Sequence, residues 1–352
     1  MGHEVMIMLA ARWHGAFDVR VEDVPAPRPG PGEVLIRVER AGICATDLEE
    51  YLTGPVSIPV GWPHPTSGRQ APLTLGHEMV GTVVEHGAGA GALDGRVVPN
   101  ILVGCGGCWY CRRGQKVLCP KVGLRGITDD GGFAEFIVTE AAGCVPVPER
   151  IGPDVAVFAE PVAVAIRAMG KAGVRSGDVV AVLGAGVIGQ LVIQLALAAG
   201  AAVVAIEPVA RRRGLAAALG AVTCGPEEGV ERVAELTGRR GADVVVECAG
   251  VPGAVRSAIE LSRSGSTVVL VGVHGGTEPI PLLPLVLEER RLLGSAGHLA
   301  DDMASAIALL ANGAVDVSRL RPEVVALVDV VGSGFERLRT DRDTLKILVD
   351  PA

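Results

Sequence analysis

Two short apolar runs frame a glycine-rich turn and a helix near the middle of the chain. Residues 179–183 and 202–206 are apolar throughout, and no charged side chain occurs between Asp178 and Glu207. Uninterrupted runs of this length are typical of parallel strands buried on both faces. The segment up to about Ala199 is rich in alanine, leucine, isoleucine and glutamine, which predicts a crossover helix. The uncharged segment between Asp178 and Glu207 is long enough to span a membrane, but its glycines argue against a membrane helix.

The same alternation of strands and helices continues downstream. Residues 243–247 and 266–272 have strand character, and residues 230–236 and 254–261 have helical character. Strands that alternate with helices in this way predict an α/β domain built on a doubly wound parallel sheet.

The N-terminal part of the chain has a different pattern. Between Val19 and Val38, four prolines interrupt an apolar alternation, which predicts short strands joined by rigid turns in an irregular β domain. Residues 51–73 are rich in glycine and proline and are expected to form a long functional loop. Residues 324–331 and 345–349 regain strand character, so we expect the C-terminus to rejoin this domain.

Composition narrows the classes of function. A chain of 352 residues exceeds what one hydrophobic core usually supports, so two domains with a cleft between them are expected. A net charge of -8 with only four lysines indicates no nucleic-acid or membrane partner and favours a small ligand of little charge. The N-terminus lacks the basic region of a signal peptide, and the eight cysteines are too few and too clustered for a disulfide framework. A cytoplasmic enzyme is expected.

Four cysteines lie within fifteen residues, at positions Cys105, Cys108, Cys111 and Cys119. Four thiolates at this spacing can surround one zinc ion and leave no open position, as in a structural site. An iron–sulfur cluster is the competing use of such a set, and a redox patch without metal is the plainer alternative. We predict a structural zinc held in a small lobe at residues 104–119.

A second metal site is predicted from residues far apart in the chain. Cys44, His77 and Glu160 offer a sulfur, a nitrogen and an oxygen, a set that suits zinc and leaves a fourth position open for water or substrate. An open zinc is a catalytic zinc. Taken singly, these residues have plainer interpretations: a buried thiol, a histidine paired with the adjacent Glu78, and a carboxylate that caps a helix.

A G-x-G-x-x-G motif lies between the predicted strand 179–183 and the helix that follows it. The motif consists of Gly184, Ala185, Gly186, Val187, Ile188 and Gly189. In this context backbone amides and the helix dipole can hold a pyrophosphate. Glu207, eighteen residues further on, can bind the adenosine ribose and would repel a 2'-phosphate, so NAD is favoured over NADP. Arg212, in the run of arginines just beyond, would reverse this preference if it folded over the ribose; otherwise these arginines form a solvated helix face.

Together these motifs resemble the zinc-dependent medium-chain alcohol dehydrogenase family over essentially the whole chain. The carriers of the resemblance are Cys44 with Thr46 and Asp47, Gly76-His77-Glu78, the four-cysteine lobe, Glu160-Pro161 and the turn at 184–189. Residues 50–55, the proline-rich loop and the sequence Leu75 to Glu78 resemble the 2,3-butanediol and polyol dehydrogenase branch. The resemblance implies a GroES-like catalytic domain (1–165 and 315–352) around a Rossmann coenzyme domain (166–314).

The resemblance also implies roles for individual residues. Catalytic zinc would be held by Cys44, His77 and either Glu78 or Glu160, and Thr46 would take the substrate proton. Where many members have a histidine five residues after the cysteine ligand, this chain has Glu49. A carboxylate is a weaker base than histidine at neutral pH unless its surroundings raise its pKa, so the proton leaves either through Glu49 or through water.

These features predict reversible oxidation of a secondary alcohol to a ketone with NAD, using one catalytic and one structural zinc per chain. A vicinal diol or cyclic polyol is the preferred substrate, because a second hydroxyl could reach the zinc or the spare carboxylate. An amino alcohol or aminocyclitol dehydrogenase is the alternative, with Glu49, Glu50 or another carboxylate of the cleft binding the ammonium group. A non-catalytic, zinc-stabilised nucleotide-binding sensor would need only one zinc. The protein is expected to be a homodimer or homotetramer.

Overall fold

A computed structural model describes residues 6–352, which form two compact units. The first unit contains the described residues up to Glu160 together with Leu299–Ala311 and Arg321–Ala352, and the second contains Pro161–His298 and Asn312–Leu320. These limits differ from the sequence-based domain boundaries at 165/166 and 314/315, which stay a prediction. Helix α9 (Ala300–Ala311) belongs to the first unit because it packs on α2 (Pro153–Ala156), and Arg150 Nε donates a hydrogen bond to the Ala311 carbonyl at 3.2 Å.

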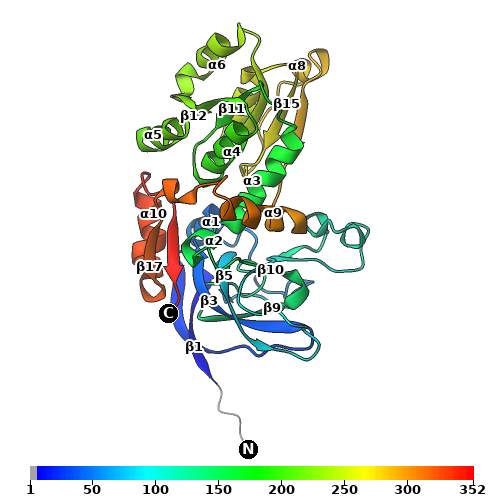
Figure 1. Cartoon of the computed structure of the whole chain (residues 1–352), viewed down its shortest axis with the longest axis vertical. Coiled ribbons are helices and arrows are strands. Elements are labelled where there is room, and N and C mark those ends of the chain that lie inside the picture. The colour runs from blue at the N-terminus through cyan, green and yellow to red at the C-terminus, as the bar shows by residue number, and fades with distance from the viewer. Residues whose placement is uncertain (1–5) are drawn as a thin grey trace, which may run out of the picture. The chain divides into compact units, whose positions relative to one another are not determined.

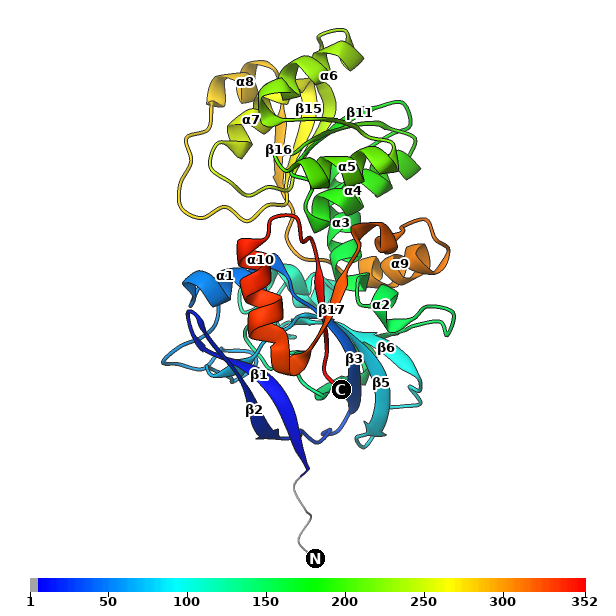
Figure 2. The same cartoon turned by 90° about the vertical axis from the view of Figure 1, so that its left-hand side faces the viewer.

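The first unit is built on two mainly antiparallel sheets (Figures 1 and 2). The larger sheet has the order β10-β6-β5-β3-β18-β17, with β9 also paired to β3, and the smaller has the order β2-β1-β4. The bounds of these strands are β1 Ile7–Gly15, β2 Asp18–Pro25, β3 Glu33–Gly42, β4 Leu73–Thr74, β5 Glu78–His86, β6 Arg96–Pro99, β9 Phe136–Glu140, β10 Cys144–Pro146, β17 Glu323–Ala326 and β18 Ile347–Asp350. Val34, Ile36 and Val38 on alternate positions of β3 are buried in the core, as the two-residue period of a strand requires.

The C-terminal segment rejoins the first unit, as predicted. Strand β18 pairs antiparallel with β3 and parallel with β17. The predicted strand at 324–331 is wrong beyond Ala326, where a 3-10 turn (Leu327–Asp329), a π-helix (Val330–Glu336) and α10 (Arg337–Thr340) follow. The reason is that Leu327, Val330 and Gly334 are buried at three- and four-residue spacing, which places them on one helical face.

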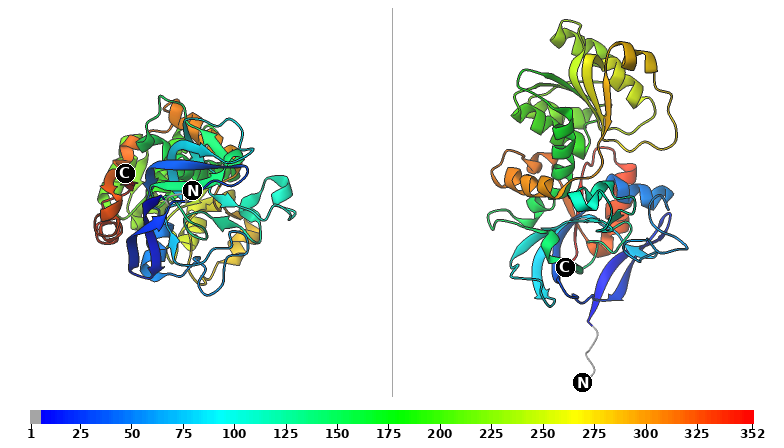
Figure 3. Two further views of the ribbon diagram at one scale, coloured as in Figure 1. Left: turned by 90° about the horizontal axis from the view of Figure 1, so that it is seen from below. Right: turned by 90° about the vertical axis from the view of Figure 1, so that its right-hand side faces the viewer.

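The second unit is a six-stranded sheet with the order β13-β12-β11-β14-β15-β16, and all of its pairings are parallel. Helices lie on both faces of this sheet (Figures 2 and 3), which makes it the doubly wound sheet expected. The strand bounds are β11 Val179–Leu183, β12 Ala202–Ile206, β13 Val222–Cys224, β14 Ala242–Glu247, β15 Ser262–Leu270 and β16 Arg291–Gly294. The helix bounds are α3 Ala159–Ala172, α4 Val187–Ala198, α5 Ala210–Leu219, α6 Gly229–Thr237, α7 Ala254–Leu261 and α8 Leu282–Leu287.

The apolar runs coincide with the observed elements of this sheet. Strands β11 and β12 have the predicted limits, and β15 begins four residues before the predicted 266 and ends at Leu270. All five residues of β11 are buried, because helices cover both faces of a parallel sheet. Among the described residues, no helix is both long enough and apolar enough to cross a membrane.

Candidate active site and metal sites

Pairing of β3 with β5 brings together two segments that lie far apart in the sequence. Gly42 at the end of β3 lies opposite Glu78 at the start of β5, so Cys44, at the N-cap of α1 (Ala45–Thr53), lies beside His77. Ligand atoms of Cys44, His77 and Glu78 all lie within 4.8 Å of one another. The structure thus gathers a sulfur, a nitrogen and an oxygen donor at a spacing that fits one zinc ion.

Asp47 organises this group from the first turn of α1. Its carboxylate is fully buried and accepts hydrogen bonds from the backbone N–H groups of Cys44 at 2.9 Å and Gly76 at 3.2 Å. One carboxylate oxygen also lies 3.4 Å from Nδ1 of His77. A carboxylate behind a metal-binding histidine fixes the orientation of the ring. Burial opposes the charged form of the imidazole, but Asp47 and Cys44 outweigh it and hold the pKa of His77 well above its ordinary value.

The turn before His77 requires a glycine. Gly76 has a φ of +94°, and a Cβ at this position would strike the ring of Phe133. Phe133 is fully buried and packs in turn against Phe335 with ring centroids 6.2 Å apart. The core of the first unit therefore fixes the backbone that presents the histidine.

Glu78 has an ionic partner that sequence reasoning missed. Nζ of Lys346 donates hydrogen bonds to the Glu78 carboxylate and, at 2.9 Å, to the carbonyl of Ile43, and both charged side chains are only 2% exposed. The available signal was a single lysine placed between Leu345 and Ile347 in the terminal apolar run. Pairing of β18 with β3 carries this lysine to the site. The charge of Glu78 is therefore balanced within the protein.

Glu160 has a different environment from Glu78. It lies in the first turn of α3, is 7% exposed, and does not join the group whose atoms all lie within 4.8 Å of one another. Its pKa is raised to about 7: burial is the largest cause, His77 opposes the shift, and Glu78 adds to it. Glu160 is thus electrostatically coupled to His77 and Glu78 without being one of the three closest donors.

The other residues singled out on α1 differ in how closely they approach this site. Oγ1 of Thr46 lies 3.9 Å from the sulfur of Cys44, so this hydroxyl is adjacent to the donor set. Glu49 is partly exposed, and the structure does not bring its carboxylate into the donor set. Glu50 is buried, and its carboxylate accepts hydrogen bonds from the backbone N–H groups of residues 56–58. It anchors the start of the long loop, so the expectation that it binds an ammonium group is wrong.

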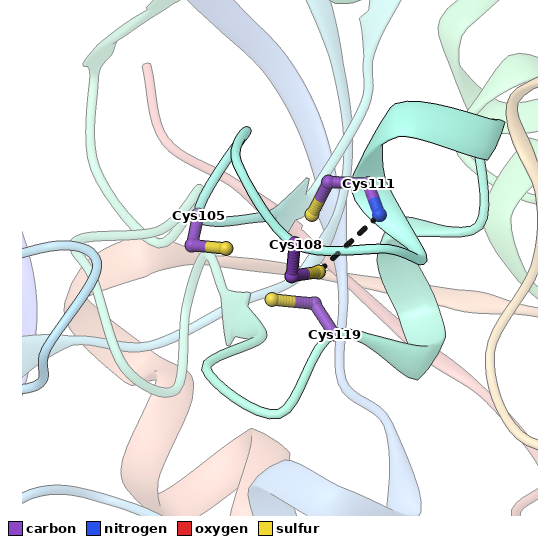
Figure 4. A group of neighbouring side chains, drawn as sticks. All are labelled: Cys105, Cys108, Cys111 and Cys119. Carbon is purple, nitrogen blue, oxygen red and sulfur yellow. Dashed lines mark hydrogen bonds between the residues drawn. The ribbon is translucent and has the colours of Figure 1, made fainter.

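The four cysteines of the predicted lobe converge in space (Figure 4). Their sulfur atoms all lie within 4.8 Å of one another, in a segment that contains two 3-10 turns and is flanked by the short strands β7 (Leu102–Val103) and β8 (Gly123–Leu124). The backbone N–H of Cys111 donates to the sulfur of Cys108 at 3.3 Å, and N–H groups of Cys108 and Gly107 lower the pKa of Cys105 to about 6. Such donors favour thiolates, the form that binds zinc.

Cys108→Ser is expected to lower the zinc content from about two ions per chain to about one, because a structural site needs all four thiolates. Zinc per chain, measured by elemental analysis of the purified protein, tests this. The matched control is Cys144→Ser, since Cys144 belongs to neither group of close ligand atoms. Loss of both metals, or of neither, in Cys108→Ser would show that the lobe is not an independent zinc site.

Zinc binding at the Cys44 site is expected to weaken as the pH falls from about 8 to about 6, because metal ligands must be unprotonated. The pKa of Glu160 is raised to about 7 and that of His77 lies well above its ordinary value, so protons compete with the metal over this range. Titration of the metal-free protein with zinc against a fluorescent chelator measures the effect. The Cys44→Ala variant binds zinc only at the four-cysteine lobe, so the difference in zinc affinity between the wild type and this variant reports on the Cys44 site. A difference that stayed the same between about pH 8 and about pH 6 would contradict the expectation.

The glycine turn of the second unit has the geometry of a pyrophosphate-binding turn. Gly184 has a φ of +84°, and a Cβ on Gly189 would strike the carbonyl of Gly184. Val187 and Ile188 begin α4, whose N-terminus can therefore face a phosphate. Glu207 follows β12 and is only 3% exposed; its two oxygens accept the N–H groups of Ala185 at 2.8 Å and Val209 at 2.9 Å.

The arginines that follow Glu207 are partly engaged by the protein. The carbonyl of Arg212 accepts a hydrogen bond from Gln190 at 2.9 Å. The guanidinium of Arg213 donates to the carbonyls of Glu207 and Pro208 at 2.8 and 2.7 Å. Arg213 thus stabilises the turn that carries Glu207.

Two family models match this chain. Residues 30–149 match the alcohol dehydrogenase GroES-like domain, and residues 187–312 match the zinc-binding dehydrogenase family. Over 348 residues the chain is 35% identical to (R,R)-butanediol dehydrogenase of Bacillus subtilis, a match that covers 98% of this chain and 100% of the relative. It is 32% identical to L-threonine 3-dehydrogenase of Pyrococcus abyssi, with 93% of this chain and 94% of the relative covered.

Solved structures agree with these matches. The crystal structure of 2R,3R-butanediol dehydrogenase from Bacillus subtilis superposes with a TM-score of 0.91 at 34% identity, covering 98% of this chain and 100% of that one. A zinc-binding dehydrogenase from Sinorhizobium meliloti 1021, solved with NADP bound, gives a TM-score of 0.86 at 32% identity, with 98% and 100% covered.

The fold and the matches define a zinc-dependent oxidoreductase that uses a nicotinamide cofactor. The chain belongs to the zinc-dependent medium-chain alcohol dehydrogenase family. The predicted fold class and enzyme class are therefore confirmed, and the alternative of a non-catalytic sensor is set aside.

Proposed function

We propose that this enzyme oxidises a secondary hydroxyl of a vicinal diol or cyclic polyol to a ketone, with NAD as hydride acceptor. The observation that carries the proposal is the pair of buried carboxyl groups, Glu78 and Glu160, beside the Cys44 and His77 donors. One carboxylate can complete the zinc site while the other remains available to a second hydroxyl. The likeness to butanediol dehydrogenases supports the same substrate class.

In this proposal the residues of the first unit have distinct roles. Cys44 and His77 hold the catalytic zinc together with one of the two carboxylates, and Cys105, Cys108, Cys111 and Cys119 hold the structural one. Bound zinc supplies a Lewis acid that lowers the pKa of an alcohol. Thr46, adjacent to the Cys44 sulfur, accepts the alcohol proton while it releases its own hydroxyl proton. The proton then leaves through Glu49 or directly through water.

The preference for NAD over NADP is assigned to Glu207. Its carboxylate lies at the end of β12 and is held by two backbone N–H groups, so a 2'-phosphate would meet a fixed negative charge. The ratio of kcat/KM for NAD to that for NADP tests this assignment in the wild type and in Glu207→Gln. A wild-type preference for NADP would overturn it.

A substrate panel tests the proposed activity. Reduction of NAD is followed with butane-2,3-diol stereoisomers, inositol-like rings, simple secondary alcohols and the amino analogues of the diols. The diols or cyclic polyols are expected to give the highest kcat/KM. Simple alcohols that performed as well as the diols would show that the second hydroxyl contributes nothing.

An amino alcohol remains the second candidate, because the chain is also similar to L-threonine 3-dehydrogenase. Glu50 is committed to the loop, so an ammonium group would have to be bound by Glu49 or another carboxylate. The amino analogues in the panel distinguish this candidate. A kcat/KM for them above that for every diol would favour it.

We also propose that the protein assembles into a homodimer or homotetramer. Strand β16 is an edge of the six-stranded sheet, and the nearby α8 exposes more than half of each of four apolar side chains, Leu282, Leu283, Val286 and Leu287. Apolar surface of this kind is typical of interfaces between subunits. Light scattering coupled to size-exclusion chromatography tests this, and a monomeric mass at micromolar concentration would contradict it.

A reducing compartment, the cytoplasm, is the proposed location. All eight cysteines are free thiols. Five of them belong to the two groups of ligand atoms, and of two others Cys224 is buried and Cys248 is partly buried. None of these seven has a role that requires a disulfide. Thiolate ligands must stay reduced to bind zinc. Free-thiol titration of the protein after isolation without reductant tests this.

A further inference from the structure

A buried carboxylate in the second unit holds a histidine that the proposed function does not use. Glu247 is the last residue of β14, and its side chain is completely buried. One of its oxygens accepts the backbone N–H groups of Ala249 at 2.6 Å and Gly250 at 2.8 Å. The other lies 2.9 Å from Nε2 of His274, whose side chain is 22% exposed. The pair is therefore a partly exposed histidine whose ring is oriented by a buried carboxylate that the backbone holds in place.

This pair lies next to the glycine turn. The backbone N–H of Cys248 donates to the carbonyl of Leu183 at 2.8 Å, and a Cβ on Gly184 would lie 3.0 Å from Ala249. Gly250 in turn packs against the backbone of Val273, the residue before His274. Three loops, after β11, β14 and β15, thus form one continuous surface at the carboxyl ends of the strands.

The strand order shows which half of a dinucleotide this surface would meet. Strand β11 lies between β12 and β14, so the sheet reverses direction of winding at the glycine turn. Dinucleotides bind across such a point, with one mononucleotide on each side. Glu207, at the end of β12, marks the adenosine side. The loops after β14 and β15 therefore belong to the nicotinamide side.

The contact with Glu247 sets which hydrogen-bonding group His274 offers. An ionised carboxylate only accepts hydrogen bonds, so the facing Nε2 carries the hydrogen. In a neutral imidazole, Nδ1 is then an acceptor. The nicotinamide half of the cofactor carries two kinds of donor, the ribose hydroxyls and the carboxamide N–H groups. The ribose is attached directly to the pyrophosphate, so its hydroxyls are the donors nearer to the glycine turn.

We infer that Glu247 and His274 form a cofactor-positioning pair, in which Glu247 orients the imidazole and Nδ1 of His274 accepts a hydrogen bond from a hydroxyl of the nicotinamide-side ribose. The inference rests on the nicotinamide cofactor of the proposed function. It adds a specific recognition group for the nicotinamide half of that cofactor. This group and Glu207 lie on opposite sides of strand β11.

Nucleotide binding without turnover tests the pair. Dissociation constants for NADH, ADP-ribose and ADP are measured by calorimetry for the wild type and for His274→Leu. Leucine has neither the N–H that faces Glu247 nor an acceptor in place of Nδ1. NADH and ADP-ribose, which carry the second ribose, are expected to bind about fivefold to tenfold more weakly, the worth of one hydrogen bond. ADP, which lacks that ribose, is expected to bind as it does to the wild type.

His14→Leu is the matched control, because Nε2 of His14 pairs with Glu22 at 2.8 Å in the first unit, in the same kind of histidine–carboxylate contact. It is expected to leave all three constants unchanged. Equal weakening of all three ligands in His274→Leu would mean that the histidine only supports the fold, and a change of less than twofold for NADH and ADP-ribose would also overturn the pair. A wild type that bound ADP but neither NADH nor ADP-ribose would overturn the cofactor assignment itself as well.

Discussion

Replacing Cys44 with alanine is expected to lower kcat/KM by roughly 10³-fold to 10⁴-fold, because Lewis-acid stabilisation by a bound metal is worth several kcal/mol and each 1.36 kcal/mol is a factor of ten. The variant removes the sulfur from the group that it forms with His77 and Glu78. Zinc content is expected to fall to about one per chain, since the four-cysteine lobe remains complete. Initial rates with the best substrate of the panel, measured beside elemental analysis, test both parts.

Cys144→Ala provides the comparison for this variant. Cys144 is partly exposed at the start of β10, and its sulfur lies 3.6 Å from the carbonyl of Glu140, away from both groups of ligand atoms. The control is expected to keep full activity and both metals. If Cys44→Ala kept both zinc ions and more than a tenth of the activity, the catalytic metal would have to be placed elsewhere.

Lys346→Met is expected to destabilise the first unit by about 3–5 kcal/mol, because it leaves the buried carboxylate of Glu78 without its partner. Methionine has a similar length and keeps most of the packing, so the lost ion pair dominates the result. All three tryptophans, Trp13, Trp62 and Trp109, lie in the first unit. Urea unfolding followed by tryptophan fluorescence therefore reports on the unit that carries the change.

A double variant separates the charge from the packing. Lys346→Met combined with Glu78→Gln removes both charges and is expected to recover most of the lost stability, since the penalty comes from one unpaired buried charge. Lys116→Met is the control: this lysine is also in the first unit, and its ion pair with Glu140, at 4.0 Å, is exposed. A loss below about 1 kcal/mol in Lys346→Met would mean that the ion pair contributes little.

The second unit was the easier part to predict from the sequence. Strands β11 and β12 have the limits that their apolar runs predicted, because a strand covered by helices on both faces must be apolar along its whole length. The glycine turn could be located for a similar local reason, since it occupies a fixed place between a strand and a helix. The mistake at 324–331 arose where a short apolar run fits a strand and a buried helical turn equally well.

The amino-acid sequence by itself determined the residues whose chemistry depends on near neighbours in the chain. The four cysteines of residues 104–119 converge because their spacing allows one loop to gather them, and the sequence Gly184 to Gly189 forms its turn from its own glycines. Only the tertiary structure decided that Glu78 pairs with Lys346 and Glu247 with His274. Lys346 reaches Glu78 across 268 residues through the pairing of β18 with β3, and no local pattern encodes which strand the terminal run joins. Buried charges are satisfied by whichever donors the packed fold brings to them, and for these carboxylates the donors are set by strand pairing and loop contacts.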